Sequence, residues 1–458
     1  MTKIAGIIAE YDPFHLGHRY QIQETRRQTG AGYIVAVMSG DFVQRGEPAI
    51  FEKSQRVRMA LSCGADLVLE LPAPFAVGSA EDFASGGISL LHKLGAVDLV
   101  SFGSECGTLG PLLGAARALA DESAHFKDAL KAQLRRGLSY PQARAAALKA
   151  GGVTKEILLA LDSPNNLLGI EYIKAILRQK SSMEPFTIKR DGLGYHDDRL
   201  LPKGEAARFA SASALRRAIF ALCPTSQADP LLLSPGQDLT GTSSCTSQYD
   251  RSAQMRSDRT GCSSLLSSQI LEQLPPDLHP LYTSGKLLPI HPDDGSSILN
   301  YRILSCIQEK IPFEDFSDIS PELAGRIREL CGRPRSFSEQ IMRLKTKQYT
   351  YTRISRGLLH LLLRIRKEDM EMYRQSGYCS YARILGFKRS AAPLLRAIKE
   401  KSTIPLIAKA ADAPKLLSPQ ARRLWDQDIY CSHVYHGLVQ QRYKITLTDE
   451  YRRPVLVL

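Results

Sequence analysis

The sequence contains no long apolar segment. No run of 18 or more apolar residues occurs among the 458 residues, and a membrane-spanning helix needs about that length. The first apolar run, Ile4–Ala9, leads directly to Glu10 and Asp12, which makes it too short and too acidic for a secretion signal. We therefore expect a cytoplasmic protein with no membrane partner.

The sequence also lacks closely spaced cysteines. Its nine cysteines are odd in number and widely scattered, whereas zinc sites use close pairs. We expect free thiols in a reducing compartment and predict no metal site. The composition is otherwise ordinary, with 43% hydrophobic and 23% charged residues, so a folded globular protein of two or three domains is expected.

Positive charge is in excess. The formal net charge is +13, and a surplus of Lys and Arg favours contact with polyanions, nucleic acid first among them. The alternative is a basic surface that merely keeps the protein in solution. Clustering of the charges separates the two interpretations.

Short apolar runs alternate with helix-like segments through the first hundred residues. The predicted strands, rich in Val, Ile and Leu, lie at 3–9, 33–38, 66–71 and 98–102. The predicted helices lie at 18–29, 53–63 and 80–94, with Gly30 and Gly64 placed as C-caps of the first two. Strands without polar alternation, separated by helices, are typical of a parallel sheet covered on both faces. We predict an α/β, Rossmann-like fold.

The rest of the chain is mainly helical in pattern. One more strand at 186–190 and a helix beginning near Ser211 complete a first domain at 1–223. The segment 224–268 is dense in Ser, Thr, Gln, Gly and Asp, and we expect a disordered insert without chemistry there. Helical patterns then predict a mainly helical, basic domain at 269–458.

The segment EYDPFHLGH at 10–18 lies between the first predicted strand and the first predicted helix. In a doubly wound sheet the ligand crevice lies beyond the carboxyl ends of the strands, and a helix N-terminus there attracts phosphate. His15 and His18, with Gly17 allowing close backbone approach, are predicted to act as positive donors toward a phosphate chain. Helix capping is the structural alternative. The segment resembles the HxGH motif of the HIGH-type nucleotidyltransferase superfamily, which includes class I aminoacyl-tRNA synthetases and pantetheine-phosphate adenylyltransferase.

Members of that superfamily carry a second motif, of the ISSTxxR type, at the start of a later helix. Residues 210–216 read ASASALR and resemble it. Two hydroxyls at a helix N-terminus can cap the helix and contact phosphate, and Arg216 can stabilise the departing pyrophosphate. A plain N-cap at Ser211 is the alternative.

Further segments resemble one bacterial family of this superfamily, the tRNA(Met) cytidine acetate ligases. They span the chain, at 10–18, 37–48, 66–72, 102–105, 163–169, 345–353 and 383–386. The insert at 224–268 departs from the family pattern, and Asp12 stands where the family commonly has asparagine.

The resemblance implies an enzyme that joins acetate to the α-phosphate of ATP and transfers the acetyl group to the wobble cytidine of elongator tRNA(Met). His15 and His18 would be catalytic. It implies ATP contacts by Ile8, Ala9, Glu10, Tyr11, Asp12, Pro13, Phe14, His15, Leu16, Gly17, His18, Gly103, one of the adjacent residues Asn165 and Asn166, Arg190, Ser211, Ser213 and Arg216. Mg²⁺ is expected on general grounds of ATP chemistry. No stable protein partner is inferred.

Independent evidence for RNA comes from residues 333–367. Ten Lys or Arg residues stand there against one acid, Glu339, with Tyr349 and Tyr351 interleaved. Cations bind the phosphate backbone, and tyrosines can stack on unpaired bases. The predicted tRNA contacts are Lys345, Lys347, Tyr349, Arg353 and Arg356. The alternative is a solvated helix face.

Two other functions remain open at this point. An adenylyltransferase acting on a small cofactor precursor would explain the N-terminal motifs but would leave the basic stretch unused. A non-catalytic RNA-binding protein with a vestigial nucleotide site would retain RNA without forming an adenylate. Acetate-dependent exchange between ATP and pyrophosphate separates these interpretations.

Overall fold

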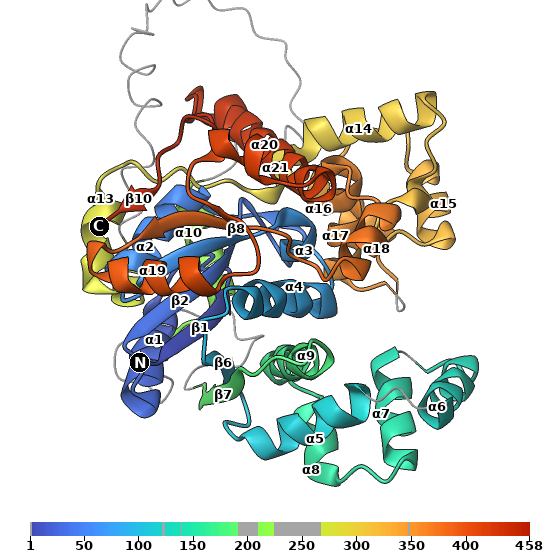
Figure 1. The fold of residues 1–458 in the computed structure, drawn as a ribbon. Helices are drawn as coiled ribbons and strands as arrows, with labels where there is room; N and C mark the ends of the chain where they lie inside the picture. The colour runs from blue at the N-terminus through green and yellow to red at the C-terminus, as the bar shows by residue number, and fades with distance from the viewer. Residues whose placement is uncertain (1, 121–123, 139, 191–208, 224–266, 347–348) are drawn as a thin grey trace, which may run out of the picture.

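The computed structural model describes residues 2–120, 124–138, 140–190, 209–223, 267–346 and 349–458 (Figure 1). Its centre is a mostly parallel sheet. The parallel strands are β1 (Ile4–Ala9), β2 (Tyr33–Ser39), β5 (Leu67–Leu71), β6 (Leu99–Ser104) and β7 (Glu184–Lys189). They lie in the order β5-β2-β1-β6-β7. Since the chain steps outward in one direction from β1 to β5 and in the other from β6 to β7, the strand order reverses beside β1, where such sheets bind ligands.

The strands carry side chains alternately to two covered faces. Ala5 and Ile7 join a buried cluster with α1 (Leu16–Thr29), α2 (Lys53–Ser62) and α10 (Ala212–Leu222). Ile4 and Ile8 join the cluster on the other face, which contains α4 (Ala80–Lys93) and α9 (Pro164–Arg178). The predicted Rossmann-like α/β fold is therefore confirmed.

The helix ends follow the expected glycine chemistry. Gly30 is the left-handed C-cap of α1, with φ of 69°, and its N–H donates to the carbonyl of Arg26. Gly64, with φ of 119°, follows Cys63, the C-cap of α2. Glycine adopts positive φ without the steric cost that a β-carbon brings.

The later part of the chain contributes strands as well as helices, which the sequence analysis did not predict. β8 (Ala382–Phe387) pairs antiparallel with β5, and β9 (Leu406–Ile407) and β10 (Leu456–Val457) pair with β8. The partner of β8 lies about 300 residues earlier in the chain, and short strands have too few residues for a distinct periodicity. The sheet is therefore mixed at this edge.

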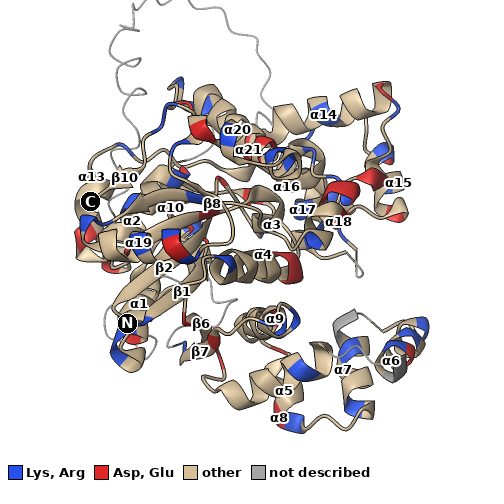
Figure 2. Cartoon of the chain, viewed as in Figure 1, with Lys and Arg blue, Asp and Glu red and all other residues tan. Residues whose placement is uncertain are grey.

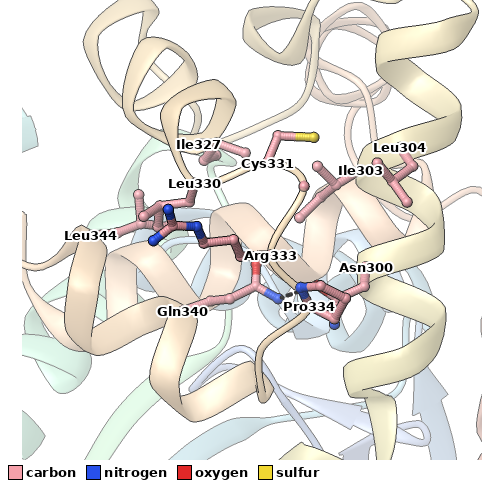
Figure 3. Close-up of a pocket in the computed structure, with 11 residues that line it drawn as sticks. Asn300, Ile303, Leu304, Ile327, Leu330, Cys331, Arg333, Pro334, Gln340 and Leu344 are labelled. Atoms are coloured by element: carbon pink, nitrogen blue, oxygen red, sulfur yellow. Dashed lines mark hydrogen bonds between the residues drawn. The ribbon is translucent and has the colours of Figure 1, made fainter.

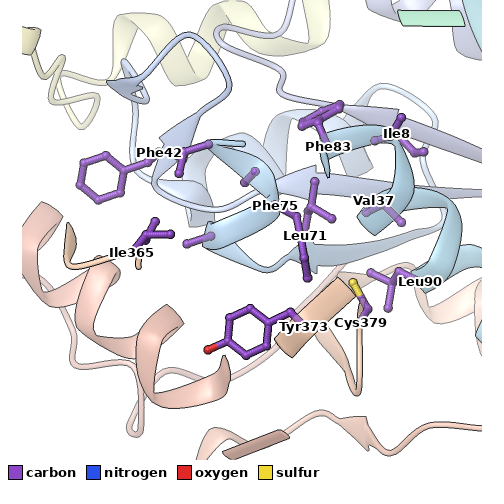
Figure 4. Close-up of a cluster of buried hydrophobic side chains, with 14 of the residues drawn as sticks. Ile8, Val37, Phe42, Leu71, Phe75, Phe83, Leu90, Ile365, Tyr373 and Cys379 are labelled. Carbon is purple, nitrogen blue, oxygen red and sulfur yellow. The ribbon is translucent and has the colours of Figure 1, made fainter. Parts of the chain in front are cut away.

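Helices make up most of the remaining described chain. They are α12 (Ser268–Glu272), α13 (His279–Thr283), α14 (Ser296–Gln308), α15 (Pro321–Glu329), α16 (Phe337–Leu344), α17 (Tyr351–Leu363), α18 (Lys367–Gln375), α19 (Ala392–Lys401), α20 (Ala413–Leu416) and α21 (Pro419–Tyr443). Their core is continuous with that of the sheet, because Phe75 and Leu71 lie in one cluster with Ile365, Tyr373 and Cys379 (Figure 4). The predicted domain boundaries at 223 and 268 stay predictions. The sheet contains strands from both sides of these boundaries.

Four helices between β6 and α9 form a unit that we call the helical arm. They are α5 (Leu109–Ala120), α6 (Ala124–Arg135), α7 (Tyr140–Ala150) and α8 (Lys155–Ala160). α5 packs against α8 and α9, while α6 packs against α7. The arm projects beyond β7, away from the sheet (Figure 1).

The seven described cysteines are free thiols, as expected, whereas Cys245 and Cys262 lie outside the described residues. Within the described ranges, no helix is long and apolar enough to cross a membrane. The predicted insert lies outside the described residues except for 267–268, where Ser267 caps the start of α12.

Candidate active site

The loop after β1 brings both predicted catalytic histidines to the start of α1. His15 is the N-cap, and its Nδ1 accepts a hydrogen bond from the N–H of Gly17 at 3.0 Å. The Nδ1 of His18 lies 3.3 Å from the backbone nitrogen of His15, and the ring centroids are 3.8 Å apart. Helix capping therefore does occur, but it uses only the Nδ1 atoms. Since each Nδ1 accepts, each neutral ring carries its proton on Nε2, where it can be donated to a phosphate oxygen.

Both histidines are neutral at pH 7 in the free protein. Burial, reinforced by the charges of Arg190 and Arg216, lowers the pKa of His15 to about 3. Burial, His15 and Arg190 hold the pKa of His18 well below its ordinary value. In the unliganded site the two imidazoles are therefore neutral donors, because a water-poor environment and neighbouring cations disfavour protonation, and their positive charge toward a bound phosphate stays a prediction. Positive charge at the site comes from the two arginines.

Two glycines stand where a neighbouring side chain approaches closely. A β-carbon on Gly17 would lie 2.8 Å from Cε1 of His15, so glycine allows this ring to fold back over the helix start. A β-carbon on Gly103 would lie 3.1 Å from Cγ of Arg190. At both positions the group that approaches is a predicted site side chain, and contact with the nucleotide stays a prediction.

The second motif meets the first in space. Ser211 caps α10 by accepting a hydrogen bond from the N–H of Ala214, as the capping interpretation requires. Arg216, almost fully buried, donates to the backbone carbonyl of Asp12 at 2.7 Å and to its carboxylate at 3.1 Å. The Oγ of Ser213 lies 3.5 Å from the same guanidinium. Asp12 thus forms a buried ion pair that orients Arg216.

A reciprocal set of hydrogen bonds joins the end of β6 to the start of α9. The Glu105 carboxylate accepts from the backbone N–H of Asn165 at 3.2 Å, from its side-chain amide at 2.6 Å, and from the backbone N–H of Asn166 at 2.8 Å. In return, Oδ1 of Asn166 accepts from the N–H groups of Glu105 and Cys106 at 2.9 and 3.2 Å. We call this arrangement the Glu105 clasp. Arg190 extends it by donating to Oδ1 of Asn165 at 3.2 Å.

The sequence analysis missed the role of Glu105. The residue stands in one of the segments that carry the family resemblance, but nothing local distinguishes it from a surface carboxylate. Its partners lie 60 and 61 residues further along the chain. The clasp thereby places Asn165, Asn166 and Arg190 beside the carboxyl end of β6. The charge of Arg190 reaches His15 in the loop after β1, which we call the histidine loop.

A hairpin made by β3 (Phe42–Val43) and β4 (Glu47–Pro48) connects the histidine loop to α17. The Glu10 carboxylate accepts from the N–H of Gln44 at 2.6 Å. At the hairpin turn, the carbonyl of Gly46 accepts from the hydroxyl of Ser355 on α17 at 2.9 Å. A β-carbon on Gly46 would lie 2.4 Å from the backbone nitrogen of Arg356, so only glycine permits this contact.

The basic stretch on and around α17 is partly neutralised. Arg335 and Arg343 share Glu339, and Arg356 pairs with Asp318 at 2.8 Å. Lys345 and Arg353 are exposed and form no ion pair within the described chain. Lys347 lies outside the described residues.

Tyr349 is less accessible than RNA stacking would require. Its ring is buried, its hydroxyl donates to Glu322 at 3.2 Å, and the guanidinium of Arg353 lies 5.0 Å from the ring centroid. A base could stack on this ring only after Arg353 and the surrounding packing had moved. A role of Tyr349 in RNA binding therefore stays a prediction, while Tyr351 is only half-buried.

A second polar cluster lies where α21 meets the sheet. Donor atoms of Asp41, His436 and Glu450 lie within 4.8 Å of one another. The ammonium of Lys53 lies 3.0 Å from Glu450, 3.6 Å from Asp41 and 2.8 Å from Glu70. Because this lysine already supplies a cation to the carboxylates, we interpret the cluster as a buried ion-pair network that fastens the C-terminal helices to the sheet.

A small cavity of about 80 Å³ lies between α14, α15 and α16 (Figure 3). Its lining is mainly apolar, with Ile303, Leu330 and Leu344 facing Arg333 and Gln340. No residue predicted to contact ATP or tRNA lines it, and we assign it no role.

Comparison with known proteins agrees with this geometry. A family described as HIGH Nucleotidyl Transferase matches residues 2–450. The fold and the paired motifs thus define a HIGH-class nucleotidyltransferase.

The relatives narrow the class. A tRNA(Met) cytidine acetate ligase of Acetivibrio thermocellus is 36% identical over 434 residues, covering 94% of each chain. That of Caldanaerobacter subterraneus is 34% identical over 453 residues, covering 99% of each chain. The crystal structure of Thermotoga maritima TmcAL bound with alpha-thio ATP is similar with a TM-score of 0.79 at 27% identity, covering 100% of this chain and 99% of that one. The chain belongs to the tRNA(Met) cytidine acetate ligase family.

Proposed function

We propose that this protein joins acetate to ATP, releases pyrophosphate, and transfers the acetyl group from acetyl-adenylate to the exocyclic amine of the wobble cytidine of elongator tRNA(Met). A carboxylate is a poor acyl donor until its oxygen becomes a good leaving group. Adenylation supplies that leaving group while the site excludes water. The product is N4-acetylcytidine, and AMP and a proton are released.

The observation that carries this proposal is the convergence of two histidines and two arginines from separate elements. His15 and His18 start α1, Arg190 follows β7, and Arg216 lies on α10. The charges of Arg190 and Arg216 both act on His15. Fixed N–H donors and guanidinium groups suit the charge that develops on the α-phosphate and pyrophosphate oxygens, and they need little reorganisation during reaction.

We assign ATP binding to the histidine loop from Ile8 to His18, the Glu105 clasp and the start of α10. In this proposal the Nε2–H groups donate to the phosphate chain, and phosphate binding favours the protonated imidazoles as charge builds up. The phosphate oxygens of ATP would hold Mg²⁺, because a hard cation prefers oxygen ligands.

The RNA surface is proposed to begin at the N-terminus of α17. Lys345 and Arg353 are its exposed cations. The hairpin that links α17 to Glu10 supports a short path between this surface and the histidine loop. An unstacked cytidine held at α17 could therefore reach an adenylate bound at that loop.

The test separates the two half-reactions. Exchange of labelled pyrophosphate into ATP should require acetate and no RNA. Incubation with labelled acetate, ATP and total tRNA, followed by nucleoside digestion, should yield labelled N4-acetylcytidine from elongator tRNA(Met). Exchange without any need for acetate, or label in no nucleoside, would contradict the proposal. RNA retention without exchange would instead indicate a vestigial nucleotide site.

A further inference from the structure

The helical arm carries a concentration of unpaired positive charge. Figure 2 shows lysines and arginines on α6, α7 and α8. Five of them are exposed and form no ion pair or side-chain hydrogen bond with a described residue: Lys131, Arg135, Arg136, Lys149 and Lys155. The described acids on these helices and their connections are Asp128 and Glu156. A surface of this kind attracts a polyanion.

The charges on α6 form a stripe. Lys127, Lys131 and Arg135 stand four residues apart, so they share one face of the helix. Four residues advance about 6 Å along an α-helix, which is commensurate with successive phosphates along a nucleic-acid strand. A stripe with this spacing suits a phosphodiester backbone better than a compact single anion.

The arm is fixed to the candidate active site at both ends. It leaves the sheet just after Glu105 and returns just before Asn165, and these residues form the Glu105 clasp. At its base, α5 packs on α8 and α9, and a β-carbon on Gly114 would lie 2.5 Å from Cδ1 of Ile157. This close packing holds the arm in a defined direction relative to the crevice.

We propose that the helical arm is a second RNA-binding surface, which contacts the phosphate backbone of the tRNA away from the reacting cytidine. The inference rests on the proposed function and adds to it a surface that lies outside the α17 region. Backbone contacts fix the position of an RNA without reading its sequence. The arm therefore sets affinity and orientation, while selection of the base takes place at the crevice.

An acidic lipid surface is the competing partner, because Leu134 and Leu138 are 39% and 37% exposed near the end of α6. The phosphate chemistry is similar, so the experiment must include both. Binding to vesicles of phosphatidylglycerol and phosphatidylcholine provides that comparison.

The test neutralises the five unpaired cations together, as Lys131→Gln, Arg135→Gln, Arg136→Gln, Lys149→Gln and Lys155→Gln. We expect tRNA binding to weaken about tenfold or more, and each lost phosphate contact to flatten the slope of log K against log salt by about 0.7–0.9. Acetate-dependent pyrophosphate exchange should keep its wild-type rate, which also shows that the variant is folded. The wild-type protein should not bind the vesicles.

A matched control removes the same net charge elsewhere. It neutralises the exposed residues Arg389, Arg396, Lys399, Lys409 and Lys415, on and near α19, to glutamine. The control should lose less tRNA affinity than the arm variant. Equal losses, unchanged affinity and salt slope in the arm variant, or vesicle binding that the arm variant abolishes while tRNA binding persists, would each overturn the inference. Absence of acetate-dependent exchange in the wild-type protein would instead contradict the proposed function.

Discussion

Substituting Glu105→Gln tests whether the clasp positions the nucleotide site. The native carboxylate accepts three hydrogen bonds from Asn165 and Asn166. Glutamine has nearly the same shape but only one acceptor oxygen. If that oxygen keeps the bonds to Asn165, the amide NH₂ must face the backbone N–H of Asn166, where two donors meet. The start of α9 should then shift relative to β6.

The magnitude follows from the bonds lost. A hydrogen bond to a charged group contributes roughly 1.5–3 kcal/mol. Glu105 is only half-buried, so solvent takes over part of each lost interaction and the lower end of that range applies. A loss of about 1.4 kcal/mol corresponds to about a tenfold change in an equilibrium constant. We expect the KM for ATP in acetate-dependent exchange to rise by about this factor, with a smaller change in kcat.

The assay is a double-mutant cycle with Asn165→Ala, measured as exchange kinetics together with thermal unfolding. If Glu105 acts through Asn165, Glu105→Gln should change the KM little further in a protein that already carries Asn165→Ala. Glu156→Gln on α8, an exposed glutamate outside the clasp, is the control and should leave the KM unchanged. An unaltered KM for Glu105→Gln, or fully additive effects in the cycle, would refute the positioning role.

Four other perturbations address the site and its surroundings. His18→Ala should slow pyrophosphate exchange roughly a hundred- to a thousandfold without loss of tRNA binding in a filter assay, and unimpaired exchange would remove His18 from the catalytic set. Lys345→Gln with Arg353→Gln should weaken tRNA binding and flatten its salt dependence while exchange persists. Replacing 224–266 by a short Gly/Ser linker should leave exchange intact, because no residue predicted to contact ATP or tRNA lies in that segment. The pKa of His15 is about 3 in the folded protein, against about 6.5 for a free imidazole. Between these two pH values the unfolded chain therefore binds more protons than the folded protein, and the free energy of unfolding falls as the pH drops. His15→Asn should reduce the slope of unfolding free energy against pH there by up to about 1.4 kcal/mol per unit in urea titrations; an identical slope would speak against a buried neutral His15.

Much of the first domain could be predicted from local signals. The apolar runs at β1, β2, β5 and β6 identify strands because each is buried on both faces and therefore lacks polar alternation. The position of the histidine loop between β1 and α1 predicts a ligand crevice because the carboxyl ends of parallel strands meet at one edge. The same reasoning could not identify β8 as a strand, because its position depends on a partner strand far away in the chain.

The sequence by itself determined the class of fold, the histidine loop, the second motif on α10 and the basic character of residues 333–367, because each depends on residue types at short spacing. Only the tertiary structure decided which groups meet. It pairs Arg216 with Asp12 across 204 residues and Glu105 with Asn165 across 60, and it buries Tyr349 beneath Arg353. It also makes the two histidines neutral. The physical reason is that protonation and exposure depend on desolvation and on nearby charges from the whole fold, and no window of sequence contains them.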